Sequence, residues 1–207
     1  MTDGSTATID IKELLGKEDI TLENYPRIRE AALSNENNTR ALEELADKLE
    51  PSTAKNALKK GIALWLLGRT KPAIEALDKA HKHEDETGTV FLGRALIAIE
   101  DSKNAKLKLK EGLGVHKDSK AIKYLLILAT LHQGELDEAE EMIKKAIAKF
   151  GESAETTFLK GFATELSGDY EESKKLYEKA LDQDPDHANA LFRLARWHAT
   201  WGEEIKA

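Results

Sequence analysis

Three glycines recur at a fixed interval near the end of the chain. Gly134, Gly168 and Gly202 follow one another every 34 residues, in the similar stretches QGELDEAEEMIKKA, SGDYEESKKLYEKA and WGEEIKA. A fixed period of this length is typical of paired-helix units that bury their apolar faces only against neighbouring units. Each glycine is expected to end one helix and to begin a turn. The interval therefore predicts an all-α array of antiparallel helix pairs.

Small residues recur upstream and downstream of these turns, where the two helices of a pair are expected to cross closely. The first helix of a pair has a glycine near its middle, at Gly61, Gly93 and Gly161. The second helix has small residues at two positions about two turns apart, first at Ala73, Ala105, Ala139 and Ser173, and then at Ala80, Gly112, Ala146 and Ala180. Larger side chains at such crossings would hold the two backbones apart.

Cap-forming residues predict where the helices begin. Their side-chain oxygens can accept hydrogen bonds from backbone N–H groups in the first helical turn. The predicted caps are Ser52, Thr70, Ser102 and Asp169, with Asn24 and Asn38 in a weaker helix pair further upstream.

The pattern resembles the tetratricopeptide repeat family. Residues 154–187 match it best, in FLKGFATELSGDYEESKKLYEKALDQDP, where the family-like positions are Gly161, Gly168, Tyr170, Tyr177, Ala180, Leu181 and Pro185. The resemblance covers residues 54–207 and implies a right-handed superhelix that serves as a non-catalytic scaffold or adaptor. Two departures stand out: Ile127 replaces the small residue of a first helix, and Glu100 replaces a turn glycine.

The resemblance divides the chain into four segments. Residues 1–19 contain a short amphipathic helix, TIDIKELL, which either caps the array or masks its groove; residues 20–53 form a degenerate helix pair; residues 54–187 form four repeats. Residues 188–207 supply the first helix and turn of an incomplete repeat. We expect the sequence to be a fragment whose next helix would cover Leu191, Leu194 and Trp201, with a natural capping helix as the alternative.

The resemblance also implies a binding groove. In the family, the second, fifth, ninth, twelfth and thirteenth residues of each unit face the concave surface. The groove residues expected here are Leu58, Ile62, Trp65, Val90, Arg94, Tyr124, Leu128, Leu131, His132, Phe158, Phe162, Glu165, Phe192 and Arg196. Such an apolar patch fits a peptide or an amphipathic helix of another protein. Alternatively, Tyr124, Phe158 and Phe162 belong to the core.

Charge and composition weigh against other function classes. The formal charge of -7 disfavours binding to nucleic acid or anionic lipid over the whole surface, although a basic run is present at Lys103, Lys106, Lys108, Lys110, Lys117, Lys120 and Lys123. Nucleic-acid binding through this run is one alternative function, and self-association into a homo-dimer is another. Because Leu107 and Leu109 alternate with the lysines, we expect a solvated helix face instead.

Candidate catalytic and metal-binding groups are sparse. The chain has no cysteine, and His81 and His83 are two residues apart, so on a helix they point to different faces and suit a solvent-exposed helix end. No nucleophile and base stand in a recognisable pattern. We therefore expect no enzyme, no metal and no cofactor. A basic n-region followed by an apolar stretch is missing at the N-terminus, so a cytoplasmic location is expected.

Overall fold

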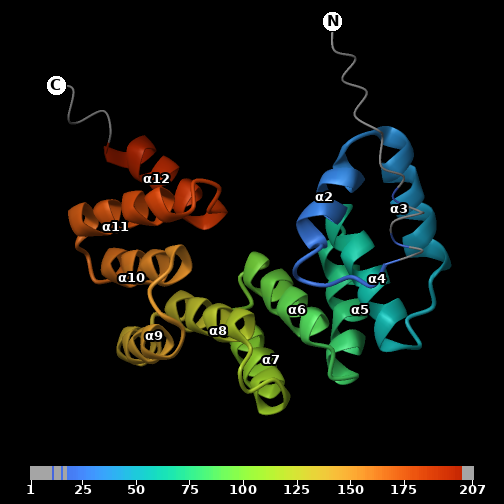
Figure 1. Cartoon of the computed structure of the whole chain (residues 1–207), viewed down its shortest axis with the longest axis horizontal. Helices are drawn as coiled ribbons and strands as arrows, with labels where there is room; N and C mark the ends of the chain where they lie inside the picture. The colour runs from blue at the N-terminus through green and yellow to red at the C-terminus, as the bar shows by residue number, and fades with distance from the viewer. Residues whose placement is uncertain (1–10, 12–14, 16–17, 202–207) are drawn as a thin grey trace, which may run out of the picture. The chain divides into compact units, whose positions relative to one another are not determined.

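Helices are the regular elements of the part of the chain that the structure describes. The computed structural model describes Ile11, Leu15 and residues 18–201, and no strand occurs among these residues. The helices are α2 (Tyr25–Leu33), α3 (Glu36–Lys48), α4 (Ala54–Leu66), α5 (Thr70–Lys82), α6 (Glu86–Ala98), α7 (Ser102–Val115), α8 (Lys120–His132), α9 (Leu136–Phe150), α10 (Ala154–Leu166), α11 (Tyr170–Gln183) and α12 (Ala188–Trp201) (Figure 1). The predicted all-α array of helix pairs is confirmed.

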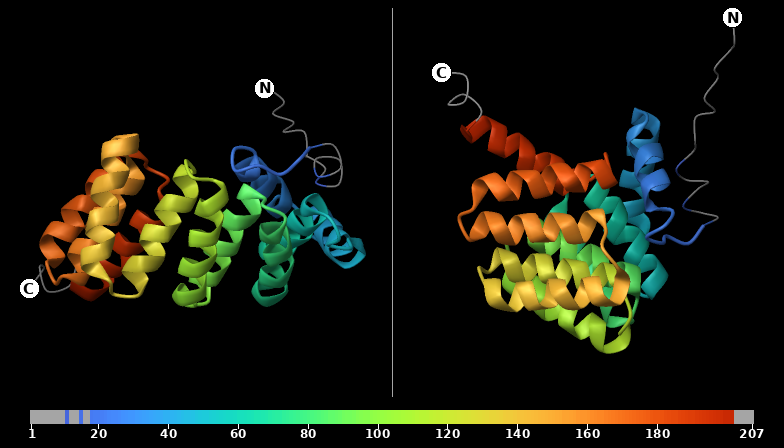
Figure 2. Two further views of the ribbon diagram at one scale, coloured as in Figure 1. Left: turned by 90° about the horizontal axis from the view of Figure 1, so that it is seen from below. Right: turned by 60° about the vertical axis from the view of Figure 1, so that its left-hand side comes forward.

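The chain divides into two compact units, Met1–Lys117 and Asp118–Ala207. In the first unit α2 packs on α3, α4 on α5 and α6 on α7, while α3 contacts α4 and α5 contacts α6. In the second unit α8 packs on α9 and α10 on α11, α10 contacts both helices of the preceding pair, and α12 lies on α11. Consecutive helices of each unit lie side by side (Figure 2).

The predicted close crossings occur at the three glycines of the first helices. A Cβ atom built on Gly61 would lie 2.6 Å from Leu77 Cγ, and one on Gly93 would lie 2.7 Å from Leu109 Cδ2. On Gly161 it would lie 2.9 Å from the ring of Tyr177. These distances are shorter than van der Waals contact, so only a residue without a side chain lets the two helices pack at this distance.

The turn that joins the two helices of a pair requires left-handed backbone. Gly134 and Gly168 have φ angles of 73° and 94°, as expected for helix-ending glycines. Glu100, which replaces the glycine in its repeat, adopts the same conformation with φ of 63°. The hydrogen bond of this turn is also the same as in the turn at Gly168. The Asp101 N–H donates to Leu96 O at 2.9 Å, and the Asp169 N–H donates to Thr164 O at 3.2 Å. Gly202 lies outside the described residues.

Some helix starts could be predicted from the sequence only to within one residue. Asp169 caps α11 as predicted, accepting a backbone hydrogen bond of 3.1 Å. Ser52, Thr70 and Ser102 each lie one residue away from the observed cap position, and Thr53 and Asp101 cap α4 and α7 instead. Only the residue flanking the first helical residue can reach the N–H groups of the first turn, so a shift of one position removes the interaction.

Asn38 has a different role from the one predicted. Asn35 caps α3, and Asn38 lies inside the helix with its amide buried. Its Nδ2 donates to Ala31 O at 2.7 Å, and its Oδ1 accepts from the Ile11 N–H at 3.3 Å. Asn24 is at the N-cap position of α2, but its side chain makes no capping bond there. Asn38 therefore joins α2, α3 and the N-terminal segment.

Two residues of the predicted N-terminal helix TIDIKELL are described, and both are buried. Ile11 and Leu15 line a pocket of about 220 Å³ together with Ala41, Leu45 and Leu49. The Lys59 ammonium donates a hydrogen bond to Leu15 O. The rest of TIDIKELL lies outside the described residues. These contacts are with α3, α4 and the residue that follows α3, as expected of a segment that covers the first helix pairs.

Candidate functional site

The predicted groove residues of the first unit divide into a buried and an accessible set. Leu58, Ile62 and Val90 are buried in the core. Trp65 is half-buried, and Arg94 is exposed with its guanidinium carbon 5.2 Å from the centroid of the Phe91 ring. A partner that docks without rearranging this unit can therefore reach Trp65 and Arg94 but not the three aliphatic side chains.

The second unit divides in the same way. The buried members are Tyr124, Leu128, Leu131, Phe158 and Phe162, and the accessible members are His132, Glu165, Phe192 and Arg196. Phe192 is 62% exposed, whereas Phe162 is 2% exposed. The burial of Tyr124, Phe158 and Phe162 places them in the core, the alternative that the sequence left open. The binding role of the accessible members remains a prediction.

Phe162 is in contact with the side chains of Arg193 and His132. The guanidinium carbon of Arg193 lies 3.7 Å from its ring centroid, and the His132 ring meets it edge-on at 5.1 Å. Phe158 stacks on it from within the core at 6.3 Å. Stacking of a guanidinium on an aromatic ring is favourable, so Phe162 helps to position Arg193.

Both oxygens of Glu165 accept hydrogen bonds. Arg193 Nη1 donates to Oε1 at 2.9 Å, and the Tyr177 hydroxyl donates to Oε2 at 2.6 Å. Burial, and then the hydrogen bond to this carboxylate, raises the pKa of Tyr177 far above its ordinary value. The same Tyr177 ring fills the crossing at Gly161, so the helix crossing and the charged cluster depend on one side chain.

A pocket of about 190 Å³ opens beside this cluster. It is lined by Glu165 from α10, Tyr170 from α11, and four residues of α12: Arg193, Arg196, Trp197 and Thr200. Their spacing of three, four and seven residues puts the four on one helix face. Glu165 and Arg196 were predicted groove residues. Tyr170 and Thr200 were not, because their place in the pocket depends on how α12 packs on the preceding pair.

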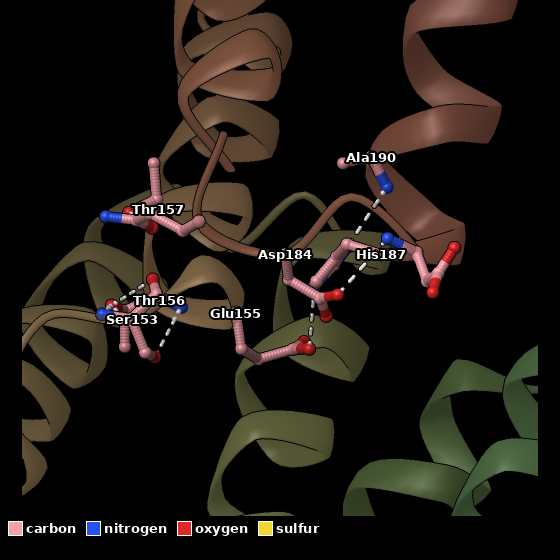
Figure 3. A network of polar contacts seen from close by, with 9 residues as sticks. Ser153, Glu155, Thr156, Thr157, Asp184, His187 and Ala190 are labelled. Atoms are coloured by element: carbon pink, nitrogen blue, oxygen red, sulfur yellow. Dashed lines mark hydrogen bonds and ion pairs between the residues drawn. The ribbon is translucent and has the colours of Figure 1, made fainter. Parts of the chain in front are cut away.

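The start of α12 is fixed by a polar network around His187 (Figure 3). The Ala190 N–H donates to His187 Nδ1 at 3.2 Å, so the imidazole caps the helix, and Nε2 lies 3.0 Å from Glu155 Oε2. Burial lowers the pKa of His187, but the hydrogen bond and charge of Glu155 outweigh it, and the net pKa is raised. This network sets the position of the helix that carries most of the pocket.

Comparisons with known proteins agree with this architecture. Models of the family described as tetratricopeptide repeat match residues 92–154 and residues 166–199. The second match includes the last residue of α10, all of α11 and most of α12, and it contains four of the six residues that line the pocket. Residues 92–154 and 166–199 carry tetratricopeptide repeats.

Other tetratricopeptide repeat proteins resemble this chain over most of its length. A thermophilic protein of this class from Thermus thermophilus has a TM-score of 0.62 and 21% identity, covering 92% of this chain and 98% of that one. YrrB, described as having an unusual peptide-binding site, has a TM-score of 0.56 and 20% identity, covering 90% and 98%. At these identities the likeness shows the fold.

A curated relative is much longer than this chain. The BBSome complex member BBS4 of Bos taurus is 27% identical over 158 residues, which is 75% of this chain. The match spans 30% of the length of BBS4.

The basic run is partly engaged in contacts within the repeats. Lys108 pairs with Asp78 at 3.3 Å and with Glu111 at 3.1 Å. Leu109 is buried, but Leu107 is 52% exposed, so the expected alternation of buried leucines is wrong. The two side chains are two positions apart on α7 and point to different faces of the helix.

His81 does not lie at a solvent-exposed helix end as predicted. It is buried, with Nδ1 2.9 Å from Thr89 Oγ1 and Nε2 3.1 Å from Glu111 Oε2. It therefore joins α5 to α6 and α7, while His83 is exposed.

Among residues 18–201 with Ile11 and Leu15, no group of three or more His, Cys, Asp or Glu side chains is placed to hold a metal ion. Within the same residues, no helix is long and apolar enough to cross a bilayer.

Proposed function

We propose that this chain is a non-catalytic interaction module that binds a peptide or an amphipathic helix of another protein. The observation that carries the proposal is the pocket of the second unit. It combines the predicted groove residues Glu165 and Arg196 with the exposed ring of Tyr170. Aromatic and arginine side chains at the edge of a pocket are the groups that most often dominate protein interfaces.

The relatives support the same class of function. A tetratricopeptide repeat scaffold suggests protein–protein interaction, and BBS4 is named as a member of a complex. YrrB is named for a peptide-binding site. A role as scaffold or adaptor is consistent with these names, and the proposal includes it together with a cytoplasmic location.

Exposed aromatic side chains give the proposal its second support. Phe192 and Trp65 stand at predicted groove positions and remain accessible, one in each unit. An amphipathic helix presents apolar side chains at i, i+3, i+4 and i+7, and it can bury such rings. Burying one large apolar side chain contributes about 1.5–3 kcal/mol.

A peptide-display selection tests the proposal without a known partner. A random peptide library is selected against the purified chain, and enriched peptides are measured by fluorescence anisotropy. We expect Phe192→Ala to weaken the bound peptides at least about tenfold, since anchors of this kind cost more than 1 kcal/mol on truncation. Leu107→Ala is the matched control, because Leu107 is similarly exposed but lies on a second helix.

Two results would contradict the proposal. One is the failure of any peptide family to enrich over an empty-support selection. The other is equal weakening by Phe192→Ala and Leu107→Ala, which would indicate non-specific adhesion to exposed apolar side chains. The mode is read from the selected peptides: apolar residues at helical spacing, together with helical circular dichroism on binding, identify an amphipathic helix.

A further inference from the structure

We infer that Trp65, Phe91 and Arg94 form a binding site for a tyrosine side chain of the partner, and that Tyr25 of this chain fills the site until the partner displaces it. These three residues are called the tyrosine site below. The inference rests on the proposed function, because it names one anchor that the bound peptide or helix carries. The tyrosine site belongs to the first unit, whereas the pocket that carries the proposed function belongs to the second.

The first observation is the place of Tyr25 among the predicted groove residues. Its ring meets the Phe91 ring edge-on, with the centroids 4.5 Å apart and the planes at 61°. Arg94 contacts the same Phe91 ring, with its guanidinium carbon 5.2 Å from the centroid. Trp65 and Arg94 are the two predicted groove residues of this unit that are not buried. Tyr25 therefore lies where a partner would reach the groove of the first unit.

The second observation concerns the Tyr25 hydroxyl. Burial raises the pKa of Tyr25, while the charge of Arg94 and then a hydrogen bond from Trp65 lower it in part. An indole N–H and a guanidinium can donate hydrogen bonds but cannot accept them. The groups near the hydroxyl therefore suit a ring that carries an oxygen acceptor, which tyrosine has and phenylalanine lacks.

The third observation is that α2 does not pack like the first helix of a regular repeat. Successive first helices contact each other along the array, as α4 does with α6 and α8 with α10, but within the described residues the extended contact of α2 is with α3 alone. The Tyr25 ring reaches instead to α6, two helix pairs further along the chain. In a stacked array each repeat contacts only its neighbours. The position of Tyr25 is therefore that of a ligand in the groove and not that of one more repeat.

The helix that carries Tyr25 is weakly held. It has nine residues, and isolated helices of this length are marginal in water. Its buried side chains are Ile28, Ala31 and Ala32, and the two alanines bury little apolar area. The Asn24 side chain at the N-cap position makes no capping bond to the first turn. The first turn can therefore open without disrupting the helix pairs of the repeats.

A side chain tethered in this way competes with any partner at a high effective concentration. Even a weak contact of Tyr25 with the tyrosine site is then enough to exclude a free tyrosine side chain. A partner that carries a tyrosine together with further anchors can displace Tyr25, because its other contacts add to the affinity. Removal of the Tyr25 side chain should open the site to a small probe.

Nuclear magnetic resonance on the whole chain tests the tyrosine site. The probes are N-acetyl-tyrosine amide, N-acetyl-phenylalanine amide and N-acetyl-leucine amide, which are uncharged and differ only in the side chain. The readout is the indole N–H signal of Trp65, identified among the three tryptophans by its loss in Trp65→Phe. Each probe is titrated to about 30 mM, since a single contact of this kind binds in the millimolar range. Leu33→Ala is the matched control for Tyr25→Ala, because Leu33 lies on the same helix and is 60% exposed.

The expected result is a saturable shift of the Trp65 signal when the tyrosine probe is added to Tyr25→Ala. Binding of this probe to the wild type and to Leu33→Ala is expected to be at least about tenfold weaker, because Tyr25 is in place. The phenylalanine probe should bind Tyr25→Ala more weakly than the tyrosine probe, and the leucine probe should give no saturable shift. Equal binding of the tyrosine probe to the wild type and Tyr25→Ala, or no saturable shift with either, would overturn the site. Equal binding of the tyrosine and phenylalanine probes would overturn the role of the hydroxyl.

Tyr25→Phe keeps the test valid if Tyr25→Ala fails to fold. This variant retains a ring against Phe91 and removes only the hydroxyl, so its circular dichroism spectrum should match that of the wild type. Loss of one hydrogen bond is expected to let the tyrosine probe bind about two- to tenfold more tightly than it binds the wild type. Unchanged binding of the probe to a folded Tyr25→Phe would show that Tyr25 is a fixed part of the core, and it would overturn the inference.

The two proposals fail in different ways. The peptide selection is run against both the wild type and Tyr25→Ala, and tyrosine is expected to enrich more strongly with Tyr25→Ala. If selected peptides bind through Phe192 but bind the wild type and Tyr25→Ala equally, and the tyrosine probe gives no shift, the tyrosine site is wrong and the interaction module stands. If the probe binds Tyr25→Ala but no peptide enriches with either protein, the tyrosine site stands and the module does not.

Discussion

Gly61 and Leu77 approach so closely that a Cβ atom on the glycine would lie 2.6 Å from Leu77 Cγ. The relationship repeats in the chain with the same sequence separation, at Gly93 with Leu109 and at Gly161 with Tyr177. In each case the first helix supplies the glycine and the second helix supplies a fully buried side chain. The helix pair is thus built around a contact that leaves no room for a methyl group.

Gly93→Ala is expected to destabilise the first unit, although alanine favours helix. The added methyl meets Leu109, whose Cδ2 lies 2.7 Å away, and overpacking of this kind costs about 1–3 kcal/mol. Gly114→Ala is the control on α7, because nothing lies within 4 Å of its Cβ position and alanine gains up to about 1 kcal/mol in a helix. Urea unfolding followed by circular dichroism measures both. Equal stability of the two variants would contradict the close crossing.

Glu100→Gly is expected to stabilise the protein by about 0.5–1 kcal/mol. Glu100 has a left-handed φ of 63°, a conformation that costs a residue with a Cβ atom about 1–2 kcal/mol, and glycine recovers part of this at the expense of a more flexible unfolded chain. The reverse change, Gly168→Glu, should destabilise, since Gly168 has φ of 94° in the equivalent turn. Thermal unfolding provides the measurement, and a lower Tm for Glu100→Gly would count against this reading of the turn.

Phe162→Ala and Phe192→Ala are expected to differ in their effect on the free energy of unfolding, because the first ring is buried and the second is exposed. Phe162 packs between Phe158, His132 and Arg193, and removing such a ring costs about 3–5 kcal/mol. Phe192 is largely exposed, so the same change should alter the free energy of unfolding by no more than about 0.5 kcal/mol. Denaturant unfolding of both variants is the measurement. A small effect at Phe162 would show that the side chains packed on its ring contribute little and that a partner can displace them.

Glu155→Gln is expected to make stability less dependent on pH between 6 and 9. Because the pKa of His187 is raised above its ordinary 6.5 by Glu155, protonated His187 stabilises the folded state. This contribution is complete below the unfolded pKa and is lost as the pH rises through the folded pKa. Although protonation gives up the 3.2 Å bond from the Ala190 N–H, the charge-assisted contact with Glu155 is the stronger one.

The free-energy difference between the wild type and Glu155→Gln should therefore be of order 1 kcal/mol larger at pH 6 than at pH 9. Glu152→Gln is the control, because Glu152 pairs with Lys179 and the pKa of its carboxyl is lowered by that hydrogen bond, away from this pH range. A pH-independent difference for Glu155→Gln would show that His187 stays neutral and acts only as a helix cap.

Ile11→Ala is expected to lower the stability of the first unit by about 2–4 kcal/mol, because the buried side chain packs against α3. The same variant distinguishes the two roles considered for the N-terminal segment. If the segment covers the first helix pairs, Tm falls and the affinity for selected peptides is unchanged. An increase in affinity would show that the segment competes with the partner for the groove.

The repeat interval, the crossing glycines and the turn glycines could all be predicted from the sequence because they depend on contacts within one repeat. Gly161 and Tyr177 lie in adjacent helices, and the same geometry recurs with the same spacing, so the pattern is visible as periodicity. The cap positions could be predicted only to within one residue, as Ser102 and Asp101 show. Neighbouring residues can both supply an oxygen, and only the backbone conformation selects one.

The exposure of the predicted groove residues was decided by tertiary structure. Phe162 and Phe192 are both phenylalanines at family-like groove positions, yet one is buried and the other exposed. Arg193 from the following repeat lies over Phe162, whereas no helix in the described part of the second unit follows α12 to cover Phe192. The pocket depends on tertiary structure in the same way, because Glu165, Tyr170 and Arg196 come from three helices. Local sequence sets which faces are apolar, but what covers each face is set by side chains from other helices, and only packing brings these together.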